Sequence, residues 1–309
     1  MKRYDLIIIG GGPAGLTASL YGRRAGLNLA ILEKAVVGGQ MRLTSEIENW
    51  PGVDRISGEQ LSEKMKAQAL SYGVEIIEAE VKELAAEDQA SGAPRIIKTS
   101  GQDYQAKSVI VASGAYHKTI DCLGAKDFVG RGISFCALCD AGFFKNEPVA
   151  VVGGGNAALE QAMHLAKVAS NVTVIHRRDK FRADKVAQDR LAKQSNIFVI
   201  LNSEVRAIRG SEEVEKIDIY NLKTKLTSTL PVNGVFLFVG QAPYVNFLPD
   251  AVKIAPGGWI ETDRRLNTSL PGVFAAGDVR HTSVRQIITA AADGGLAALE
   301  AYKYLESHF

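Results

Sequence analysis

Short runs of consecutive apolar residues alternate along this chain with glycine-rich turns and amphipathic stretches. Continuous apolar runs of strand length are typical of parallel strands that are buried on both faces. They predict buried strands over residues 6–9, 28–32, 108–114, 149–152, 171–175, 234–240 and 272–278. Two further strands are expected over residues 74–81 and 95–99, on either side of a polar stretch, residues 85–94, that we expect to be a solvated hairpin loop.

The amphipathic stretches between these runs predict helices over residues 16–21, 56–73, 159–169 and 285–305. In the second of them, Leu61, Met65 and Leu70 are expected to lie on one side. The last begins with many alanines and glycines, which core packing explains as well as ligand binding does. Strands that alternate with helices predict an α/β fold with parallel sheets.

The first apolar run leads into a glycine-rich turn of the pattern G-x-G-x-x-G. The turn reads Gly10-Gly11-Gly12-Pro13-Ala14-Gly15. Such glycines permit a tight turn and let backbone N–H groups approach a pyrophosphate at the start of the following helix. The second strand ends in Glu33, a carboxylate that can accept hydrogen bonds from ribose hydroxyls. This order predicts a dinucleotide site; the alternative is an incidental glycine-rich loop.

The same arrangement returns in the second half, where the turn reads Gly153-Gly154-Gly155-Asn156-Ala157-Ala158. His176 follows Gly153 at the spacing at which Glu33 follows Gly10, and it opens the run His176-Arg177-Arg178, with Arg182 close behind. Cations in place of the acid can hold a 2′-phosphate, arginine in bidentate fashion. We therefore expect NADPH at this site; a solvated basic turn is the alternative.

We expect the two dinucleotide sites to bind different cofactors. One would hold a permanently bound flavin, FAD, and the other would bind a nicotinamide nucleotide that exchanges with solution. Other small or polar residues end the strands of the first half and of the returning segment. Gly114 permits close approach of a cofactor, and Asp278, after Gly277, can hydrogen-bond ribitol or phosphate oxygens of FAD. Backbone N–H groups near Gln286 and Ile287 are candidates to face the flavin.

Between the two glycine-rich turns lies the sequence Cys136-Ala137-Leu138-Cys139-Asp140. A Cys-x-x-Cys pair can close and reopen a disulfide ring and so hold two electrons. Half a zinc site or two buried small residues are the alternatives, but no second such pair or His-x-His partner is present, so we expect no metal. Asp140 suits general acid–base work, helix N-capping, or both. The third cysteine, Cys122, is expected to be a buried bystander.

Composition narrows the function classes. Hydrophobic residues form 46% of the 309 residues and charged residues 23%, which suits ordinary globular domains. The net charge of +2 favours neither nucleic acid nor an anionic membrane surface. No apolar run is long enough for a membrane span, and the short run after the start does not suit a signal peptide. A cytoplasmic protein is expected.

The organisation we predict is discontinuous, with two Rossmann-like domains of three-layer ββα type. Residues 1–115 form the first segment of the FAD-binding domain, and residues 242–309 form its second segment. The NADPH-binding domain, which carries the cysteine pair, is inserted between them as residues 116–241.

These motifs together resemble the low-molecular-weight thioredoxin reductases over essentially the whole chain. The resemblance rests on the two glycine-rich turns, the cysteine pair with Asp140, and the runs at residues 38–40, 48–52, 176–183, 272–278 and 285–286. It implies homodimers with FAD in the first domain and NADPH in the second, and it adds Gly39, Gln40, Asn49 and Arg285 to the candidate cofactor contacts. The chain departs from the family at Asn156-Ala157, where Asp-Ser is usual, and around Asp293, where the family often has Ala-Gly-x-Gly.

The resemblance also implies roles. Cys139 would lie nearer the flavin, and Cys136 would attack the disulfide of thioredoxin or of a thioredoxin-like protein, with Asp140 moving the proton. The alternatives are a ferredoxin-dependent flavin thioredoxin reductase, a reductase of another thioredoxin-like or low-molecular-weight disulfide, and a flavin-binding redox sensor without enzymatic activity.

Overall fold

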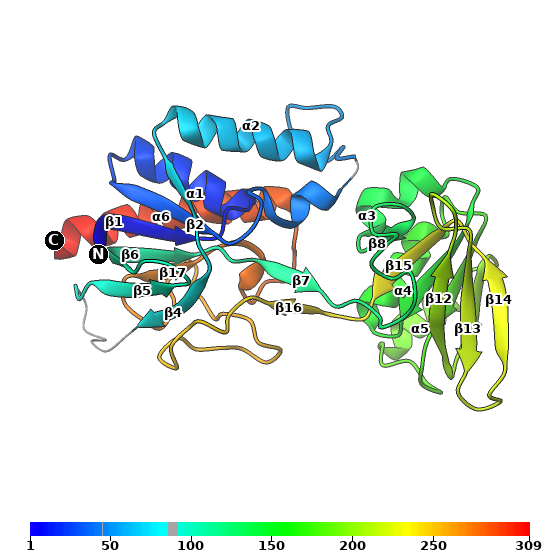
Figure 1. Cartoon of the computed structure of the whole chain (residues 1–309). Coiled ribbons are helices and arrows are strands. Elements are labelled where there is room, and N and C mark those ends of the chain that lie inside the picture. Colours follow the sequence, from blue (N-terminus) through cyan, green and yellow to red (C-terminus); the bar gives the residue numbers. More distant parts are fainter. Residues whose placement is uncertain (45, 86–91) are drawn as a thin grey trace. The chain divides into compact units, whose positions relative to one another are not determined.

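A computed structural model describes residues 1–44, 46–85 and 92–309 of the chain (Figure 1). These residues form two compact units. The first consists of Met1–Tyr116 together with Ala242–Phe309, and the second of His117–Gln241. The chain passes between the units twice, and strands β7 (Ala115–His117) and β16 (Gln241–Pro243) pair with each other where it does so.

The first unit is built on a seven-stranded sheet in the order β3-β2-β1-β6-β5-β4, with β17 added beside β6. Five of its strands run parallel: β1 (Lys2–Ile9), β2 (Leu29–Glu33), β3 (Glu75–Glu78), β6 (Tyr104–Val111) and β17 (Val273–Ala275). The other two are β4 (Val81–Ala85) and β5 (Arg95–Thr99). They pair antiparallel with each other, and β5 also pairs antiparallel with β6. Of the polar stretch expected to form the hairpin loop, residues 86–91 lie outside the described part of the chain.

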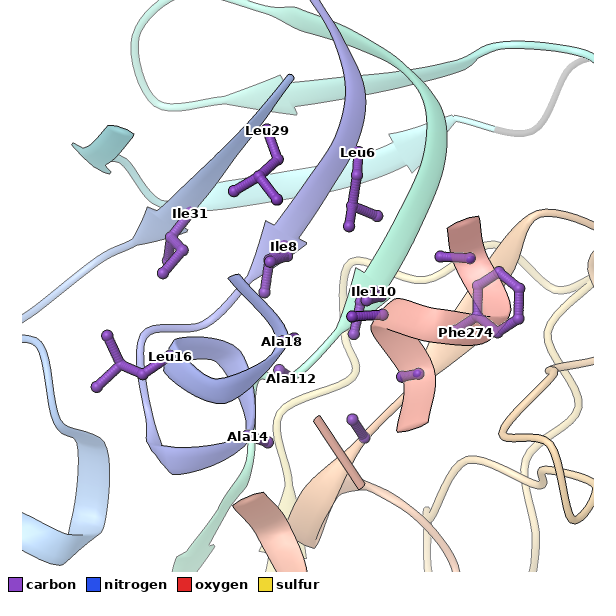
Figure 2. Packing of buried hydrophobic residues seen from close by; sticks show 14 of the residues in the cluster. Leu6, Ile8, Ala14, Leu16, Ala18, Leu29, Ile31, Ile110, Ala112 and Phe274 are labelled. Atoms are coloured by element: carbon purple, nitrogen blue, oxygen red, sulfur yellow. The ribbon is translucent and has the colours of Figure 1, made fainter. Parts of the chain in front are cut away.

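Helices cover one face of this sheet. They are α1 (Pro13–Arg24), α2 (Gly58–Ser71) and α6 (Ile287–His308), with short 3-10 turns η1 (Gly39–Leu43) and η3 (Gly277–Val279). Figure 2 shows Leu6 and Ile8 of β1 beside Ile31 of β2, on the face that α1 crosses. Their neighbours in sequence point to the opposite face, as the two-residue period of a strand requires, and pack against β4, β5 and residues 245–260.

The second unit has a parallel five-stranded sheet in the order β11-β10-β9-β15-β8. Its strands are β8 (Ile133–Ser134), β9 (Pro148–Gly153), β10 (Asn171–Ile175), β11 (Ile197–Ile200) and β15 (Gly234–Phe238). An antiparallel layer of β12 (Ser203–Arg209), β13 (Lys216–Asn221) and β14 (Thr227–Pro231) accompanies it. The helical elements are α3 (Ala137–Asp140), η2 (Ala141–Phe144), α4 (Asn156–Leu165) and α5 (Lys185–Leu191). The α/β class with parallel sheets is therefore confirmed.

Several details of the sequence prediction are wrong; the strands expected over residues 108–114 and 234–240, for example, end at Val111 and Phe238. On α2, Leu61 is buried and Met65 packs against the same cluster, but Leu70 is 48% exposed and Ala69 is buried in its place. A helix repeats about every four residues, so positions 61, 65 and 69 share a face and position 70 turns away. The strand expected over residues 74–81 is two strands, β3 and β4. The strand expected over residues 272–278 ends at Ala275, because Gly277 adopts a φ of 76° and begins η3.

Of the helices that the structure describes, none is long and apolar enough to cross a membrane.

Candidate functional site

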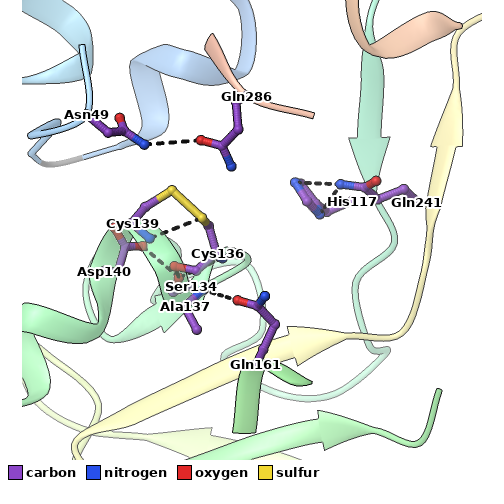
Figure 3. Close-up of a disulfide and its surroundings, with 10 residues drawn as sticks. All are labelled: Asn49, His117, Ser134, Cys136, Ala137, Cys139, Asp140, Gln161, Gln241 and Gln286. Carbon is purple, nitrogen blue, oxygen red and sulfur yellow. Dashed lines mark hydrogen bonds between the residues drawn. A yellow bond between two sulfur atoms is a disulfide. The ribbon is translucent and has the colours of Figure 1, made fainter. Parts of the chain in front are cut away.

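A disulfide joins Cys136 to Cys139 at the start of the short helix α3, with the two Cα atoms 5.3 Å apart (Figure 3). Cys136 precedes the first helical residue, and its Sγ accepts the N–H of Cys139 at 3.2 Å. The predicted ring is confirmed, because the structure joins both sulfurs in the S–S bond. A reducible ring of this kind is a two-electron carrier.

Asp140 follows the ring and lies largely buried beneath it. Its Oδ2 accepts the hydroxyl proton of Ser134 at 2.6 Å, whereas its Oδ1 is buried and has no partner among the described residues. Burial raises the pKa of the Asp140 carboxyl, and the hydrogen bond from Ser134 opposes that rise. The alternative role as an N-cap is not seen, because the Asp140 side chain makes no capping bond to η2.

Two residues beside the disulfide were missed by the sequence prediction. Ser134 ends β8 two positions before Cys136, and nothing in the sequence distinguishes it from other serines. Gln161 of α4 accepts the N–H of Ala137 at 3.1 Å through its Oε1. Gln161 did carry a signal: it adjoins the buried helix stripe that Ala158, Ala162 and Leu165 form, where a polar residue suggests a specific partner.

The first glycine-rich turn has the geometry of a dinucleotide loop. Gly10 adopts a φ of 111°, and a Cβ there would lie 2.3 Å from the carbonyl oxygen of Ala112. A Cβ on Gly15 would lie 1.8 Å from the carbonyl oxygen of Gly10, so this position permits no side chain while α1 stays against β1. Gly12, the N-cap of α1, faces open space and makes no side-chain cap. The helix N-terminus is therefore open to an anion.

Glu33 lies directly under this turn. Its Oε2 accepts the N–H of Gly11 at 2.7 Å and its Oε1 accepts the N–H of Ala35 at 2.9 Å. Gly39 packs against the same turn, because a Cβ on it would lie 3.3 Å from the Cα of Gly12. Gly12, Glu33 and Gly39 thus converge on one end of the sheet.

The second turn repeats the first with one change. Gly153 has no room for a side chain, since a Cβ would lie 2.6 Å from the carbonyl oxygen of Phe238. Ala158 stands where the first turn has its last glycine, and its methyl group is buried. Gly155 is the N-cap of α4, again with open space beside it and without a side-chain cap. Both turns therefore offer an uncapped helix N-terminus next to a glycine.

His176 occupies the place in the second turn that Glu33 has in the first. A Cβ on Gly154 would lie 2.4 Å from its Nδ1, and its ring stacks on Phe181 at a centroid distance of 5.7 Å. The side chain is buried, and its Nε2 has no partner among the described residues. Burial, and then the neighbouring arginines, lower the pKa of His176, which keeps the ring neutral.

The arginines that follow are exposed, in contrast to His176. Arg177 and Arg178 form no ion pair within the described residues, and Arg182 is also exposed. The segment is held against the turn by its backbone, because the N–H groups of Arg182 and Ala183 both donate to the carbonyl of Gly154. The structure thus presents three exposed cations beside the second turn.

Asn156 and Ala157 begin α4, and Asn156 already has a partner. Its Nδ2 donates to Oδ2 of Asp184 at 2.8 Å, and its Oδ1 accepts the N–H of Asp184 at 2.7 Å. This reciprocal pair joins the start of α4 to the start of α5. Asn156, where the family usually has Asp, therefore makes a structural contact between these two helices.

The remaining candidate residues of the first unit gather near the start of α6. Asn49 donates to Oε1 of Gln286 at 3.1 Å (Figure 3), and Gln286 and Ile287 begin the helix. The guanidinium of Arg285 lies 3.7 Å from the ring centroid of Trp259. Three further candidates, Gln40 in η1, Gly114 after β6 and Gly277 before Asp278, make no bond to this group.

Asp278 is partly buried, and this desolvation raises the pKa of the carboxyl to about 6, against the opposing charge of Arg285. The Nε atom of Arg285 is itself buried without a partner among the described residues. This unmet donor of Arg285, next to the Asp278 carboxyl, fits a polar cofactor that would accept its hydrogen bond.

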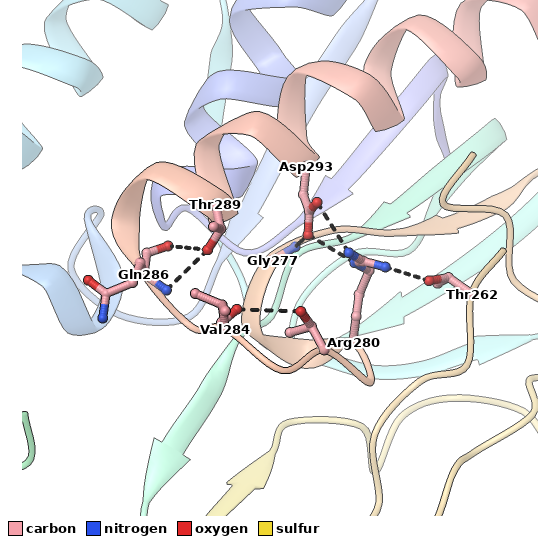
Figure 4. Close-up of polar contacts among 8 residues, drawn as sticks. Thr262, Gly277, Arg280, Val284, Gln286, Thr289 and Asp293 are labelled. Carbon is pink, nitrogen blue, oxygen red and sulfur yellow. Dashed lines mark hydrogen bonds and ion pairs between the residues drawn. The ribbon is translucent and has the colours of Figure 1, made fainter. Parts of the chain in front are cut away.

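Asp293 shapes the wall of this region (Figure 4). Its Oδ2 accepts the N–H of Gly277 at 3.0 Å and pairs with Nε of Arg280 at 2.9 Å, while Arg280 also donates to Oγ1 of Thr262. A Cβ on Gly277 would lie 3.0 Å from the Cβ of Ala14, so the two segments are in contact. Asp293, at which the chain differs from the family, therefore anchors the Gly277 turn to α6.

Two open dinucleotide-type turns and a disulfide define a class of protein, the disulfide oxidoreductases that use dinucleotide cofactors. The family model described as "Pyridine nucleotide-disulphide oxidoreductase" matches residues 4–294. A thioredoxin reductase of Listeria innocua is 42% identical over 99% of this chain and 95% of its own length. The chain belongs to the pyridine nucleotide-disulphide oxidoreductase family, and membership implies the use of a flavin and a pyridine nucleotide.

Solved structures agree. Thioredoxin reductase from Streptococcus pyogenes matches with a TM-score of 0.92 at 41% identity, covering 99% of each chain. A ferredoxin-flavin thioredoxin reductase from Clostridium acetobutylicum matches with a TM-score of 0.54 at 30% identity, again over 99% of each chain.

Proposed function

We propose that this protein is an NADPH-dependent thioredoxin-disulfide reductase that uses FAD. The observation that carries the proposal is the Cys136–Cys139 disulfide, closed beside a partly buried carboxylic acid in the unit that also contains the second dinucleotide turn. The relatives named thioredoxin reductase, at 41–42% identity over nearly the whole chain, support thioredoxin or a thioredoxin-like protein as the substrate.

FAD is assigned to the first unit. The N-terminus of α1 would hold its pyrophosphate and Glu33 its ribose, while the partly buried Asp278 and the buried Nε atom of Arg285 would form hydrogen bonds to it. The assigned residues are Gly10, Gly12, Pro13, Ala14, Gly15, Glu33, Gly39, Gln40, Asn49, Gly114, Gly277, Asp278, Arg285, Gln286 and Ile287.

NADPH is assigned to the second unit. The N-terminus of α4 would hold the pyrophosphate, and the exposed arginines would hold the 2′-phosphate. His176 would support Gly154 from beneath as a neutral ring. The assigned residues are Gly153, Gly155, Asn156, Ala157, His176, Arg177, Arg178 and Arg182. The corresponding domains are residues 1–115 with 242–309 for FAD and residues 116–241 for NADPH.

When bound, FAD supplies the two-electron step between the nicotinamide and the disulfide. The residues of the chain do the rest. Two electrons open the Cys136–Cys139 bond, Cys139 stays on the flavin side, and Cys136 becomes the thiolate that attacks the substrate disulfide. The N–H of Cys139, which already points at Sγ of Cys136, stabilises that thiolate. Asp140 carries the proton that one sulfur gains and loses.

We also propose that the protein is a homodimer in the cytoplasm. On α6, Ile288, Leu296 and Leu299 are all at least 40% exposed and lie on one side of the helix, within an arc of about 80°. A second copy would cover these apolar side chains. The test is the molecular mass in solution, which would be twice that of the chain.

The second candidate is electron supply by ferredoxin, which the name of the ferredoxin-flavin thioredoxin reductase from C. acetobutylicum gives for that protein. The three exposed arginines beside the second turn favour NADPH, since a ferredoxin-dependent protein needs no site for a 2′-phosphate. A reductase of another thioredoxin-like or low-molecular-weight disulfide shares the same residues and differs only in substrate.

Stopped-flow reduction of the bound flavin tests the electron donor. NADPH should bleach the flavin rapidly, NADH slowly, and reduced ferredoxin no faster than the background. Rapid bleaching by ferredoxin without bleaching by NADPH would overturn the assignment of the donor.

A further inference from the structure

The hydroxyl of Ser134 links the backbone of the redox ring to the carboxyl of Asp140 (Figure 3). Ser134 is 5% exposed and ends β8, so its backbone is held by the central sheet. Its Oγ accepts the N–H of Cys136 at 3.0 Å and donates to Oδ2 of Asp140 at 2.6 Å. One side chain therefore positions both the first cysteine and the acid.

The direction of these bonds follows from counting protons. A serine hydroxyl has one proton to donate, and the backbone N–H of Cys136 can only donate to it. The hydroxyl proton has two acceptors within reach, Oδ2 of Asp140 at 2.6 Å and the carbonyl of Cys136 at 3.4 Å. That carbonyl already accepts the N–H groups of Cys139 and Asp140. The proton is therefore on the bond to Asp140, and Oδ2 is the acceptor.

The two oxygens of Asp140 then differ in function. Oδ2 accepts from Ser134 and is the C=O oxygen whenever the acid is protonated. Oδ1 is buried without a partner in the described part of the chain, so it is the oxygen on which a transferable proton resides.

We propose that Ser134 is a positioning residue for proton transfer: it holds Oδ2 of Asp140 and so leaves the proton on Oδ1 for exchange with a sulfur of the Cys136–Cys139 pair. The proposal rests on the proposed disulfide reductase function, in which Asp140 is the acid. Nothing in the motif itself assigns Ser134 this role.

No titratable group on the described helices next to α3 competes with the cysteines for the proton of Asp140. The elements that pack most closely on α3 are α4 and η2, and their titratable groups are Glu160 and His164 on α4, with none on η2. Neither of these groups affects the pKa of Asp140, which burial raises and Ser134 lowers.

The step balances with an external dithiol such as dithiothreitol. A dithiothreitol thiolate attacks the protein disulfide, and the departing sulfur takes the proton from Oδ1 of Asp140 as the S–S bond breaks. The second dithiothreitol thiol then displaces the other protein sulfur and closes its own ring. The dithiol loses two electrons and two protons, and the two protein sulfurs gain them, one proton by way of Asp140.

The test is the rate at which dithiothreitol reduces the disulfide in the FAD-bound protein, followed by alkylation and mass spectrometry across acidic to basic pH. Ser134→Ala should slow the reaction about tenfold near neutral pH, the scale of one hydrogen bond to a charged group. It should also move the Asp140 inflection of the pH profile to higher pH. Ser134→Thr, which keeps the hydroxyl, should restore both, and Asp140→Asn should remove the inflection.

Ser108→Ala is the matched control, because Ser108 is fully buried and its hydroxyl donates to a carbonyl, that of Gly272, away from the ring. It should leave rate and profile unchanged. A Ser134→Ala profile that superimposes on the parent, an equal loss in Ser108→Ala, or an inflection that survives Asp140→Asn would overturn the proposal. The assay contains neither NADPH nor thioredoxin, so failure of the proposed function would show separately, as failure to reduce thioredoxin.

Infrared difference spectra of the parent and Asp140→Asn give a second measurement that needs no serine variant to fold. The protonated Asp140 should show the C=O stretch of a carbonyl that accepts a hydrogen bond. A C=O stretch of a free carbonyl would overturn the proposal.

Discussion

Removing the two exposed arginines of the second turn, Arg177 and Arg178, should weaken NADPH binding selectively. Their side chains make no ion pair among the described residues, so their loss should cost the fold little. A charge-assisted hydrogen bond to a phosphate contributes about 1.5–3 kcal/mol, and exposure reduces this. With about 1–1.5 kcal/mol for each arginine, the pair contributes about 2–3 kcal/mol.

The double variant Arg177→Ala/Arg178→Ala should therefore raise the KM for NADPH by roughly 30- to 150-fold. The KM for NADH, which lacks the 2′-phosphate, should change little. His176 cannot replace the lost charge because burial lowers its pKa and keeps the ring neutral. Steady-state kinetics with both nucleotides and a fixed disulfide substrate measure the two constants.

Lys223→Gln/Lys225→Gln is the matched control. It removes the same two positive charges from the turn between β13 and β14 of the same unit. It should leave both KM values near those of the parent. Equal increases of the two KM values in the arginine variant would refute the assignment of the 2′-phosphate to these residues.

Three further predictions concern the first turn, the partly buried Asp278 and the cysteines. Gly15→Ala should lose FAD and lower the melting temperature, because its Cβ would lie 1.8 Å from the carbonyl oxygen of Gly10. Gly12→Ala should keep the fold and only weaken FAD retention, so equal melting temperatures of the two variants would contradict this prediction. The pKa of Asp278 is raised to about 6, above its unfolded value, so the FAD-free protein should lose stability as pH rises from about 4 through 6. In urea titrations Asp278→Asn should abolish that loss, and the same pH dependence in parent and variant would contradict this prediction. Cys139→Ser should trap a mixed disulfide with thioredoxin through Cys136, visible on a non-reducing gel; a stable adduct of Cys136→Ser instead would reverse the two roles.

Features that depend on local pattern were predictable from the sequence. The apolar runs marked the buried strands, because a parallel strand covered on both faces has no polar side to alternate with. The glycines at positions 10, 15 and 153 were predictable, because a Cβ at each of them would meet a backbone carbonyl oxygen. The Cys136–Cys139 spacing, together with the absence of a second such pair and the two flanking glycine-rich turns, predicted the disulfide that the structure contains.

Features that depend on tertiary contact were not predictable. Ser134 matters because β8 places it beneath the ring, and a lone serine carries no pattern. The spacing of His176 matched that of Glu33, but only the packed structure shows that its ring is buried under Gly154. Leu70 is apolar but lies on the exposed face of α2, because the helical period brings position 69, and not position 70, onto the face of positions 61 and 65.

The central claim is that two electrons from NADPH reach a thioredoxin disulfide through Cys136 and Cys139. The most direct measurement counts new thioredoxin thiols for each NADPH oxidised. The account predicts two thiols per NADPH in the parent, and none in Cys136→Ser or Cys139→Ser, while both variants still pass electrons from NADPH to a small-molecule oxidant. Full thioredoxin reduction by either variant would contradict the account.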